Sequence, residues 1–240
     1  MQCLDERQLA ALDAPAFQQA RPYPWINSQG LIREQAYPLL AEQLPELEQF
    51  TASFGARRAH GQRPHDRYVL EYASGPRLGE AWQQFMAELQ GPAYRRFLCR
   101  MLGTRAFFLT FHWHYAPPGC SVSPHCDAPR KLGSHIFYFN TEADWQPDWG
   151  GETLVLDDGG RLSPKSAPGF DEFDRTIASE SLGNRSLLFM RRGNSWHGVR
   201  PVRCPPGRLR KVFIVVINRW TPAAVLKHLS QRLAGGRRAP

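Results

Sequence analysis

Short apolar and alternating segments, separated by turns, dominate the second half of the chain. From residue 107 to residue 220, runs rich in aliphatic and aromatic side chains are interrupted by Gly, Pro, Asn or Asp. This pattern predicts β-strands, in which successive side chains point to opposite faces. Because no helical pattern intervenes to make parallel crossovers, the closely spaced strands favour a double-sheet jelly roll. The expected strands lie at residues 107–115, 121–127, 134–140, 152–157, 176–181, 186–191, 196–202 and 211–220.

The N-terminal part of the chain has apolar residues at intervals of three and four, the spacing of short amphipathic helices. Trp82, Phe85 and Leu89 share one stripe of such a helix, which we interpret as a packing face rather than a binding groove. Gly103 suits the left-handed residue that ends a helix. The expected helices, interrupted by prolines, lie at residues 4–12, 29–48, 78–89 and 94–102, and one strand is expected at residues 66–72.

These elements predict a mainly β protein with flanking helices. A length of 240 residues is sufficient for one large core. We expect residues 1–105 to form a mostly helical N-terminal annex packed on the core and residues 106–221 to form the β core. Residues 222–240 are expected to form a C-terminal helix, at 223–233, and a flexible tail. Residues 162–175 lack periodicity, and two interpretations stay open for this loop: a lid near the site or a mobile surface excursion.

Composition and charge change this picture little. Hydrophobic residues make up 42% of the chain, and Gly and Pro number 20 each, as in a globular protein with many turns. The net charge of +8 is dispersed, apart from a basic cluster at residues 235–238 that we interpret as a solvated tail. No nucleic-acid-binding motif is found, so we expect no nucleic acid partner. The sequence shows no membrane span and no leader segment, which predicts a cytoplasmic protein.

Three residues have the pattern of a metal site. His125 and Asp127 are two positions apart on a predicted strand, a spacing that directs both side chains to the same face. His197 lies far downstream at the start of a late strand, and a strand-rich fold can bring it back to the same place. Two histidines and one carboxylate suit non-haem Fe(II), because they fill one face of the ion and leave the opposite positions open.

The cysteines do not extend this site. Cys126 lies between two of the candidate ligands, but strand alternation directs it to the opposite face, so we expect it to pack rather than to coordinate. The scattered set lacks a C-x-x-C pair, which argues against a disulfide framework and fits a reducing compartment. Its members are Cys3, Cys99, Cys120, Cys126 and Cys204.

A dicarboxylate cosubstrate at such an iron site requires a fixed cation, and the last predicted strand contains one. Alternation places Arg210 on the same face as Val212 and Ile214. A guanidinium followed by inward aliphatic residues suits a buried carboxylate, since it can bind both oxygens. Arg208 lies two residues earlier and would point to the same face, so alternation leaves the choice between the two arginines open.

Five segments of the chain occur together in the order found in one enzyme family. They resemble the Fe(II)/2-oxoglutarate-dependent dioxygenases, specifically the prolyl-4-hydroxylase-like branch. The resemblance covers about residues 107–220 and implies a double-stranded β-helix, or jelly roll, with helices packed outside. The segments are H-C-D at 125–127, I-F-Y-F-N at 136–140, W-G-G-E-T-L-V-L at 149–156, S-W-H-G-V-R-P-V at 195–202 and the strand that contains Arg210.

The resemblance implies roles for single residues. The two histidines and the aspartate described above match the iron ligands, and Arg210 matches the arginine that pairs with the distal carboxylate of 2-oxoglutarate. Tyr138 falls where the branch often has a tyrosine bonded to that carboxylate, and Tyr115 matches another tyrosine near the cosubstrate. The insertion R-C-P-P-G lengthens the interval after His197, which keeps Arg208 as the alternative to Arg210.

The resemblance also implies an enzyme, a hydroxylase that uses Fe(II), 2-oxoglutarate and O2 and releases succinate and CO2. Ascorbate is a further candidate cofactor. The substrate stays open between a small molecule, an amino acid and a prolyl peptide or protein, and so does the oligomeric state. Two other functions are a non-catalytic sensor that binds the metal and 2-oxoglutarate, and a cupin-type metalloenzyme without 2-oxoglutarate. The complete ligand set argues against the first, and Arg210 argues against the second.

Overall fold

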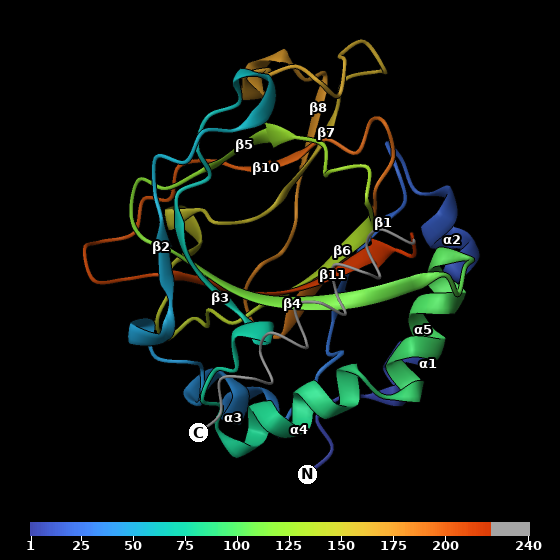
Figure 1. Ribbon diagram of the computed structural model, residues 1–240, viewed down its shortest axis with the longest axis vertical. Helices are drawn as coiled ribbons and strands as arrows, with labels where there is room; N and C mark the ends of the chain where they lie inside the picture. The colour runs from blue at the N-terminus through green and yellow to red at the C-terminus, as the bar shows by residue number, and fades with distance from the viewer. Residues whose placement is uncertain (222–240) are drawn as a thin grey trace.

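The computed structural model describes residues 1–221, in which two antiparallel sheets face each other and helices cover the larger sheet (Figure 1). The helix predicted at residues 223–233 lies outside the described residues. The helices are α1 (Glu6–Ala11), α2 (Ala14–Gln19), α3 (Tyr37–Glu42), α4 (Glu80–Leu89) and α5 (Pro92–Leu102). The strands are β1 (Trp25–Gln29), β2 (Thr51–Ser53), β3 (Arg67–Glu71), β4 (Phe107–Ala116), β5 (Val122–His125), β6 (Lys131–Tyr138), β7 (Leu154–Asp157), β8 (Arg175–Ala178), β9 (Arg185–Met190), β10 (His197–Val199) and β11 (Arg210–Arg219). Short 3-10 helices lie at Leu47–Gln49, Ala59–Gly61, Tyr72–Ser74, Pro147–Trp149 and Phe170–Glu172.

The larger sheet has the strand order β1-β9-β6-β11-β4-β3-β2, with the long strand β11 between β6 and β4. Val212 of β11 lies opposite His114 of β4 on one side and Tyr138 of β6 on the other. Since side chains alternate along a strand, these three residues share the face turned toward the smaller sheet. Phe213 and Trp113, one position away, share the opposite face and belong to the main hydrophobic core.

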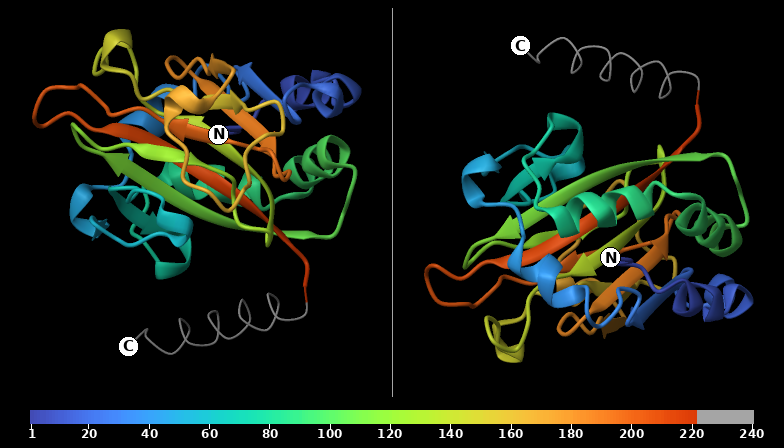
Figure 2. Two further views of the ribbon diagram at one scale, coloured as in Figure 1. Left: turned by 90° about the horizontal axis from the view of Figure 1, so that it is seen from above. Right: turned by 90° about the horizontal axis from the view of Figure 1, so that it is seen from below.

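Helices α4 and α5 cover that outer face of the larger sheet (Figure 2). The apolar stripe of α4 places Trp82 at the centre of the contact, fully buried, with its ring centroid 5.1 Å from those of Trp113 and Phe213. Its indole nitrogen donates a hydrogen bond to the Leu40 carbonyl oxygen at 2.9 Å. The stripe predicted as a packing face is therefore the contact between the helical layer and the sheet.

Trp82→Ala should lower the free energy of unfolding by about 3–5 kcal/mol, because it removes a fully buried indole and leaves a cavity between helix and sheet. Urea unfolding of the metal-free protein measures this change. Gln84→Ala on the exposed side of the same helix is the matched control, with an expected change within about 0.5 kcal/mol. Equal effects of the two substitutions would contradict the assigned packing.

The smaller sheet has the order β5-β10-β7-β8 and faces the larger sheet across an apolar cluster. Its outer face is covered by the segment at residues 162–175, from which Phe170 and Leu162 pack near Trp196. A Cβ at Gly198 would lie 2.9 Å from the Phe170 ring, so the close approach of this segment requires glycine there. Of the two interpretations of this loop, a lid would require its residues to lie over the interior. Phe170 instead packs on the outside of the smaller sheet.

The mainly β jelly roll with flanking helices is confirmed, and each of the eight strands predicted between residues 107 and 220 has an observed counterpart. Of the short helices predicted within residues 29–48, the structure has α3 and the 3-10 helix at Leu47–Gln49. The first part of this range is not helical, because the chain turns at Gly30 with φ of 72° and Pro38 lies in the first turn of α3. Strands β1 and β2 were not predicted. No helix among residues 1–221 is long and apolar enough to cross a membrane.

Candidate metal site and adjoining cavity

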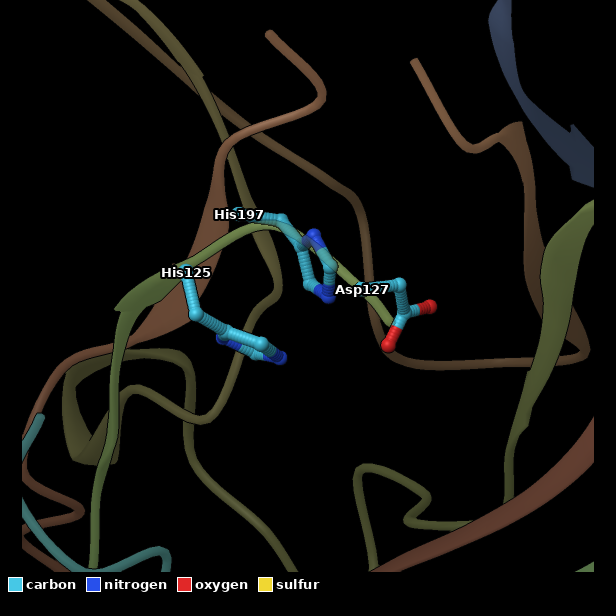
Figure 3. A group of neighbouring side chains, drawn as sticks. All are labelled: His125, Asp127 and His197. Carbon is cyan, nitrogen blue, oxygen red and sulfur yellow. The ribbon is translucent and has the colours of Figure 1, made fainter. Parts of the chain in front are cut away.

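His125, Asp127 and His197 lie together between the two sheets (Figure 3). His125 ends β5 and His197 begins β10, and the two are partners in the antiparallel pairing of these strands. The ligand atoms of the three residues all lie within 4.8 Å of one another, and all three side chains are buried. The structure therefore brings together the three residues that the sequence singled out for a metal.

Each histidine is oriented by a hydrogen bond with the backbone two residues earlier. The Nδ1 atom of His125 lies 3.0 Å from the Ser123 carbonyl oxygen, and that of His197 lies 3.0 Å from the Ser195 carbonyl oxygen. A carbonyl oxygen can only accept, so Nδ1 of each ring donates its proton and the lone pair is on Nε2. This tautomer leaves Nε2 of both rings free to bind a cation.

Asp127 is held by two neighbours. Its Oδ1 atom forms an ion pair with Lys131 Nζ at 2.6 Å, and its Oδ2 atom accepts a hydrogen bond from Ser134 Oγ at 3.1 Å. Burial raises the pKa of the Asp127 carboxyl, but the Lys131 ammonium and the two nearby histidines outweigh burial, so the pKa lies below its usual range. The carboxylate is thus ionised and held in place by two donors.

The two histidines are neutral at physiological pH. Burial lowers the pKa of His125 well below its ordinary value, and the neighbouring rings of His197 and His65 lower it further. Burial also lowers the pKa of His197, although Asp127 opposes this effect. Two neutral imidazoles and one carboxylate fit a divalent transition metal, and the open-sided 2-His-1-carboxylate set fits Fe(II).

A cavity of about 190 Å³ adjoins these three residues, and Arg210 lines it. Arg210 is buried at the first position of β11, where its guanidinium donates hydrogen bonds to the Gly151 carbonyl oxygen and, at 3.3 Å, to Thr153 Oγ1. It forms no ion pair with a carboxylate among residues 1–221. A buried cation without an anion is costly, so this end of the cavity fits a carboxylate group.

Arg208, the alternative, is exposed and precedes β11 in a turn. The alternation of side chains could not distinguish the two arginines in the sequence. It applies only within a strand, and the observed strand begins at Arg210. The geometry therefore favours Arg210 as the partner of a carboxylate in the cavity.

Tyr138 lies on the interior face of β6, fully buried beside Arg210, whose guanidinium carbon is 5.8 Å from the centre of the tyrosine ring. Its hydroxyl is 2.8 Å from Ser179 Oγ, with which it shares a hydrogen bond. Tyr138 and Ser179 thus form part of the polar surroundings of Arg210, next to the position where a carboxylate would bind.

The structure does not bring Tyr115 to the cavity, so its predicted role near the cosubstrate is corrected. Tyr115 lies on the outer face of β4, donates a hydrogen bond to the Pro45 carbonyl oxygen at 3.1 Å and stacks on Phe50. Alternation places His114, its neighbour, on the interior face, where it lines the cavity. The spacing to His125 matched the family, but the direction of the side chain depends on the strand's pairing with β11.

Several cavity residues were not predicted. His65, Arg58 and Arg67 line the cavity from the N-terminal part of the chain, and Lys131 lines it from the start of β6. The segment that contains Arg58 has no periodicity, so the sequence offered no signal for it. Cys126 does not line the cavity, and Trp196 packs in the hydrophobic core.

Comparisons with known proteins agree with this geometry. Residues 110–221 match the family model of the 2OG-Fe(II) oxygenase superfamily. No curated protein has a significantly similar sequence. The matched residues include the three candidate metal ligands and Arg210.

The fold is similar to those of several solved structures. A Pseudomonas putida prolyl-4-hydroxylase is 19% identical with a TM-score of 0.60, and the match covers 86% of this chain and 98% of that one. A prolyl hydroxylase from Trichoplax adhaerens, in complex with a hypoxia inducible factor peptide fragment, is 12% identical with a TM-score of 0.58 and coverage of 95% and 93%. The alpha ketoglutarate dependent carbocyclase SnoK from nogalamycin biosynthesis is 12% identical with a TM-score of 0.62 and coverage of 93% and 92%.

Proposed function

We propose that the chain is a dioxygenase of the 2OG-Fe(II) oxygenase superfamily, whose family model matches residues 110–221, and that it hydroxylates a C–H bond of its substrate. The observation that carries this proposal is that one cavity contains both the two-histidine, one-carboxylate set and the unpaired guanidinium of Arg210. The first fits Fe(II) and the second fits a carboxylate of 2-oxoglutarate. This pairing also disfavours a cupin-type enzyme that has no need of the cosubstrate.

We assign the roles as follows. His125, Asp127 and His197 hold the metal, and Arg210 binds the distal carboxylate of 2-oxoglutarate with Tyr138 beside it. When bound, Fe(II), 2-oxoglutarate and O2 supply the oxidant, with succinate and CO2 as co-products.

The chain's own contribution is position and exclusion of water. The backbone bonds of the two histidines set their rings before a metal arrives, and Lys131 and Ser134 set the carboxylate of Asp127. The aliphatic residues Val212 and Ile214 line the cavity next to Arg210, so a bound carboxylate is shielded from solvent on that side. In such surroundings a guanidinium–carboxylate pair is stronger than in water.

Hydroxylation is the outcome that we propose, with a small molecule, an amino acid or a prolyl peptide as the substrate. The structures of similar fold include two prolyl hydroxylases and a carbocyclase, which do not separate these substrate classes. The five cysteines are free in the structure, which supports our proposal of a reducing, cytoplasmic location. We also retain the division of the chain at about residue 105 as a proposal, although β1, β2 and β3 extend the larger sheet from the N-terminal side.

Substrate-stimulated succinate formation tests the function. The purified chain is incubated with Fe(II), 2-oxoglutarate, O2 and ascorbate, against a library of amino acids, prolyl peptides and small metabolites, and succinate is measured. We expect slow succinate formation without substrate and a clear increase with one class of compounds. Binding of 2-oxoglutarate without turnover under any condition would instead support a sensor, and absence of 2-oxoglutarate binding would contradict the proposal.

A further inference from the structure

Two arginines from the N-terminal part of the chain also line the cavity. Arg58 lies in the segment between β2 and β3, and Arg67 is the first residue of β3. Within the described part of the chain, neither forms an ion pair with a carboxylate, and the Nε atoms of both are buried without a hydrogen-bond partner. Arg67 donates one hydrogen bond, from Nη1 to the His65 carbonyl oxygen at 2.5 Å. Among residues 1–221, the guanidinium of Arg67 therefore has one hydrogen-bond acceptor and that of Arg58 has none.

The strand register of the larger sheet shows where Arg67 lies relative to Arg210. Tyr68 pairs with Tyr115, which places Arg67 opposite Ala116, and Ala116 in turn pairs with Arg210. Arg67 and Arg210 thus start from the same level of the sheet, two strands and roughly 10 Å apart. The small side chain of Ala116 leaves the space between them open to the cavity.

The charges that line the cavity do not balance. Four cations, Arg58, Arg67, Lys131 and Arg210, face two carboxylates, Asp66 and Asp127. Lys131 is paired with Asp127, while Asp66 accepts a hydrogen bond from the Gly55 backbone nitrogen at 2.7 Å. A bound Fe(II) and a bound 2-oxoglutarate cancel each other's charge, so the cavity keeps a surplus of two positive charges when both are present.

The surplus positive charge lies in partly buried surroundings, which costs free energy. Burial lowers the pKa of Arg67, and the nearby charge of Arg58 lowers it further, although Asp66 opposes this. Burial lowers the pKa of His65, which also lines the cavity, and the charges of Arg58 and Arg67 lower it further. An anion bound between them would remove this repulsion and satisfy the free donors.

We propose that Arg58 and Arg67 bind an anionic group of the substrate, a carboxylate or a phosphate, and so present a nearby C–H bond to the metal site. This inference rests on the proposed function, in which Arg210 is already assigned to the distal carboxylate of 2-oxoglutarate. The substrate class is therefore acidic: a compound or peptide with a carboxylate or phosphate a short distance from the carbon that is oxidised.

Anion binding to the full chain tests the proposal without depending on turnover. The protein is loaded with Fe(II) and saturating 2-oxoglutarate under anaerobic conditions, and acetate and sulfate are titrated by isothermal titration calorimetry as probes of a carboxylate and of a tetrahedral anion. We expect saturable binding of at least one probe. Arg58→Gln and Arg67→Gln should each weaken it by about 10- to 100-fold, the effect of losing a hydrogen bond to a charged group.

Arg57→Gln is the matched control, because Arg57 is exposed, adjacent in sequence and absent from the cavity lining. It should leave probe binding unchanged, and Arg67→Lys, which keeps the charge, should retain part of it. Thermal unfolding of each variant checks that the fold is intact. Probe binding that is equal in the wild type and the Arg58→Gln/Arg67→Gln variant, or not saturable in the wild type, would overturn the proposal.

The affinity for 2-oxoglutarate, measured on the same variants, separates the two levels of inference. Failure of the wild type to bind 2-oxoglutarate would contradict the proposed function. Normal 2-oxoglutarate binding together with an unchanged anion affinity in the double variant would contradict only the anion site. A loss of 2-oxoglutarate affinity in the double variant, by 10-fold or more, would assign both arginines to the cosubstrate and overturn the inference.

Discussion

His125→Ala should abolish stoichiometric Fe(II) binding and reduce 2-oxoglutarate-dependent succinate formation by more than about 100-fold. The reason is that the site has three donors from the chain, and even the loss of a group that only supports a metal ligand costs 10- to 100-fold. Removing one donor outright leaves one imidazole and one carboxylate, too few to hold the ion at low concentration. Fe(II) titration and succinate measurement on the same preparation test both effects.

His112→Ala is the control for this substitution. His112 also lies on a strand of the larger sheet, but it does not line the cavity, and its ring faces Glu71 at 3.9 Å. Metal binding by this variant should equal that of the wild type. If His125→Ala still bound Fe(II) in a one-to-one ratio, the assignment of the metal ligands would be wrong.

Arg210→Met should weaken 2-oxoglutarate binding by roughly 100-fold or more, corresponding to about 3 kcal/mol for the loss of one partner of a buried ion pair. Methionine keeps much of the aliphatic volume while removing the charge. The KM for 2-oxoglutarate should rise accordingly, and Fe(II) binding should be unchanged because Arg210 does not belong to the metal-binding group. Calorimetric titration of 2-oxoglutarate measures the affinity directly.

Arg208→Met is the matched control, since Arg208 has the same parity but is exposed in the turn before β11. It should change the affinity by less than about two-fold, as expected of an exposed position. A large effect of Arg208→Met with none of Arg210→Met would reverse the assignment. In the cosubstrate-free protein, Arg210→Met should not lower the thermal midpoint, because the substitution removes a buried cation that has no anionic partner among residues 1–221.

Within the β core, prediction from the sequence succeeded where local pattern determines structure. Turn residues bounded each strand from β4 to β11, and alternation gave the correct faces of Val212 and Phe213. The helical region predicted at residues 29–48 began too early, because periodicity outweighed the turn at Gly30. Strands β1 and β2 were missed because they are short and are stabilised by pairing with β9 and β3 rather than by their own composition.

The sequence by itself singled out His125 and Asp127, because two-residue spacing on a predicted strand directs both side chains to one face. In the structure β5 ends at His125, so the place of Asp127 beside it also depends on the segment that follows the strand. The sequence also indicated His197 and an arginine of the last strand. Only the tertiary structure showed that Arg210 lines the cavity while Arg208 is exposed, turned Tyr115 away from the cavity, and brought Arg58 and Arg67 into it. The reason is physical: strand alternation is a local property, whereas the boundary of a strand, the face that is buried and the partners of a loop depend on contacts between distant segments.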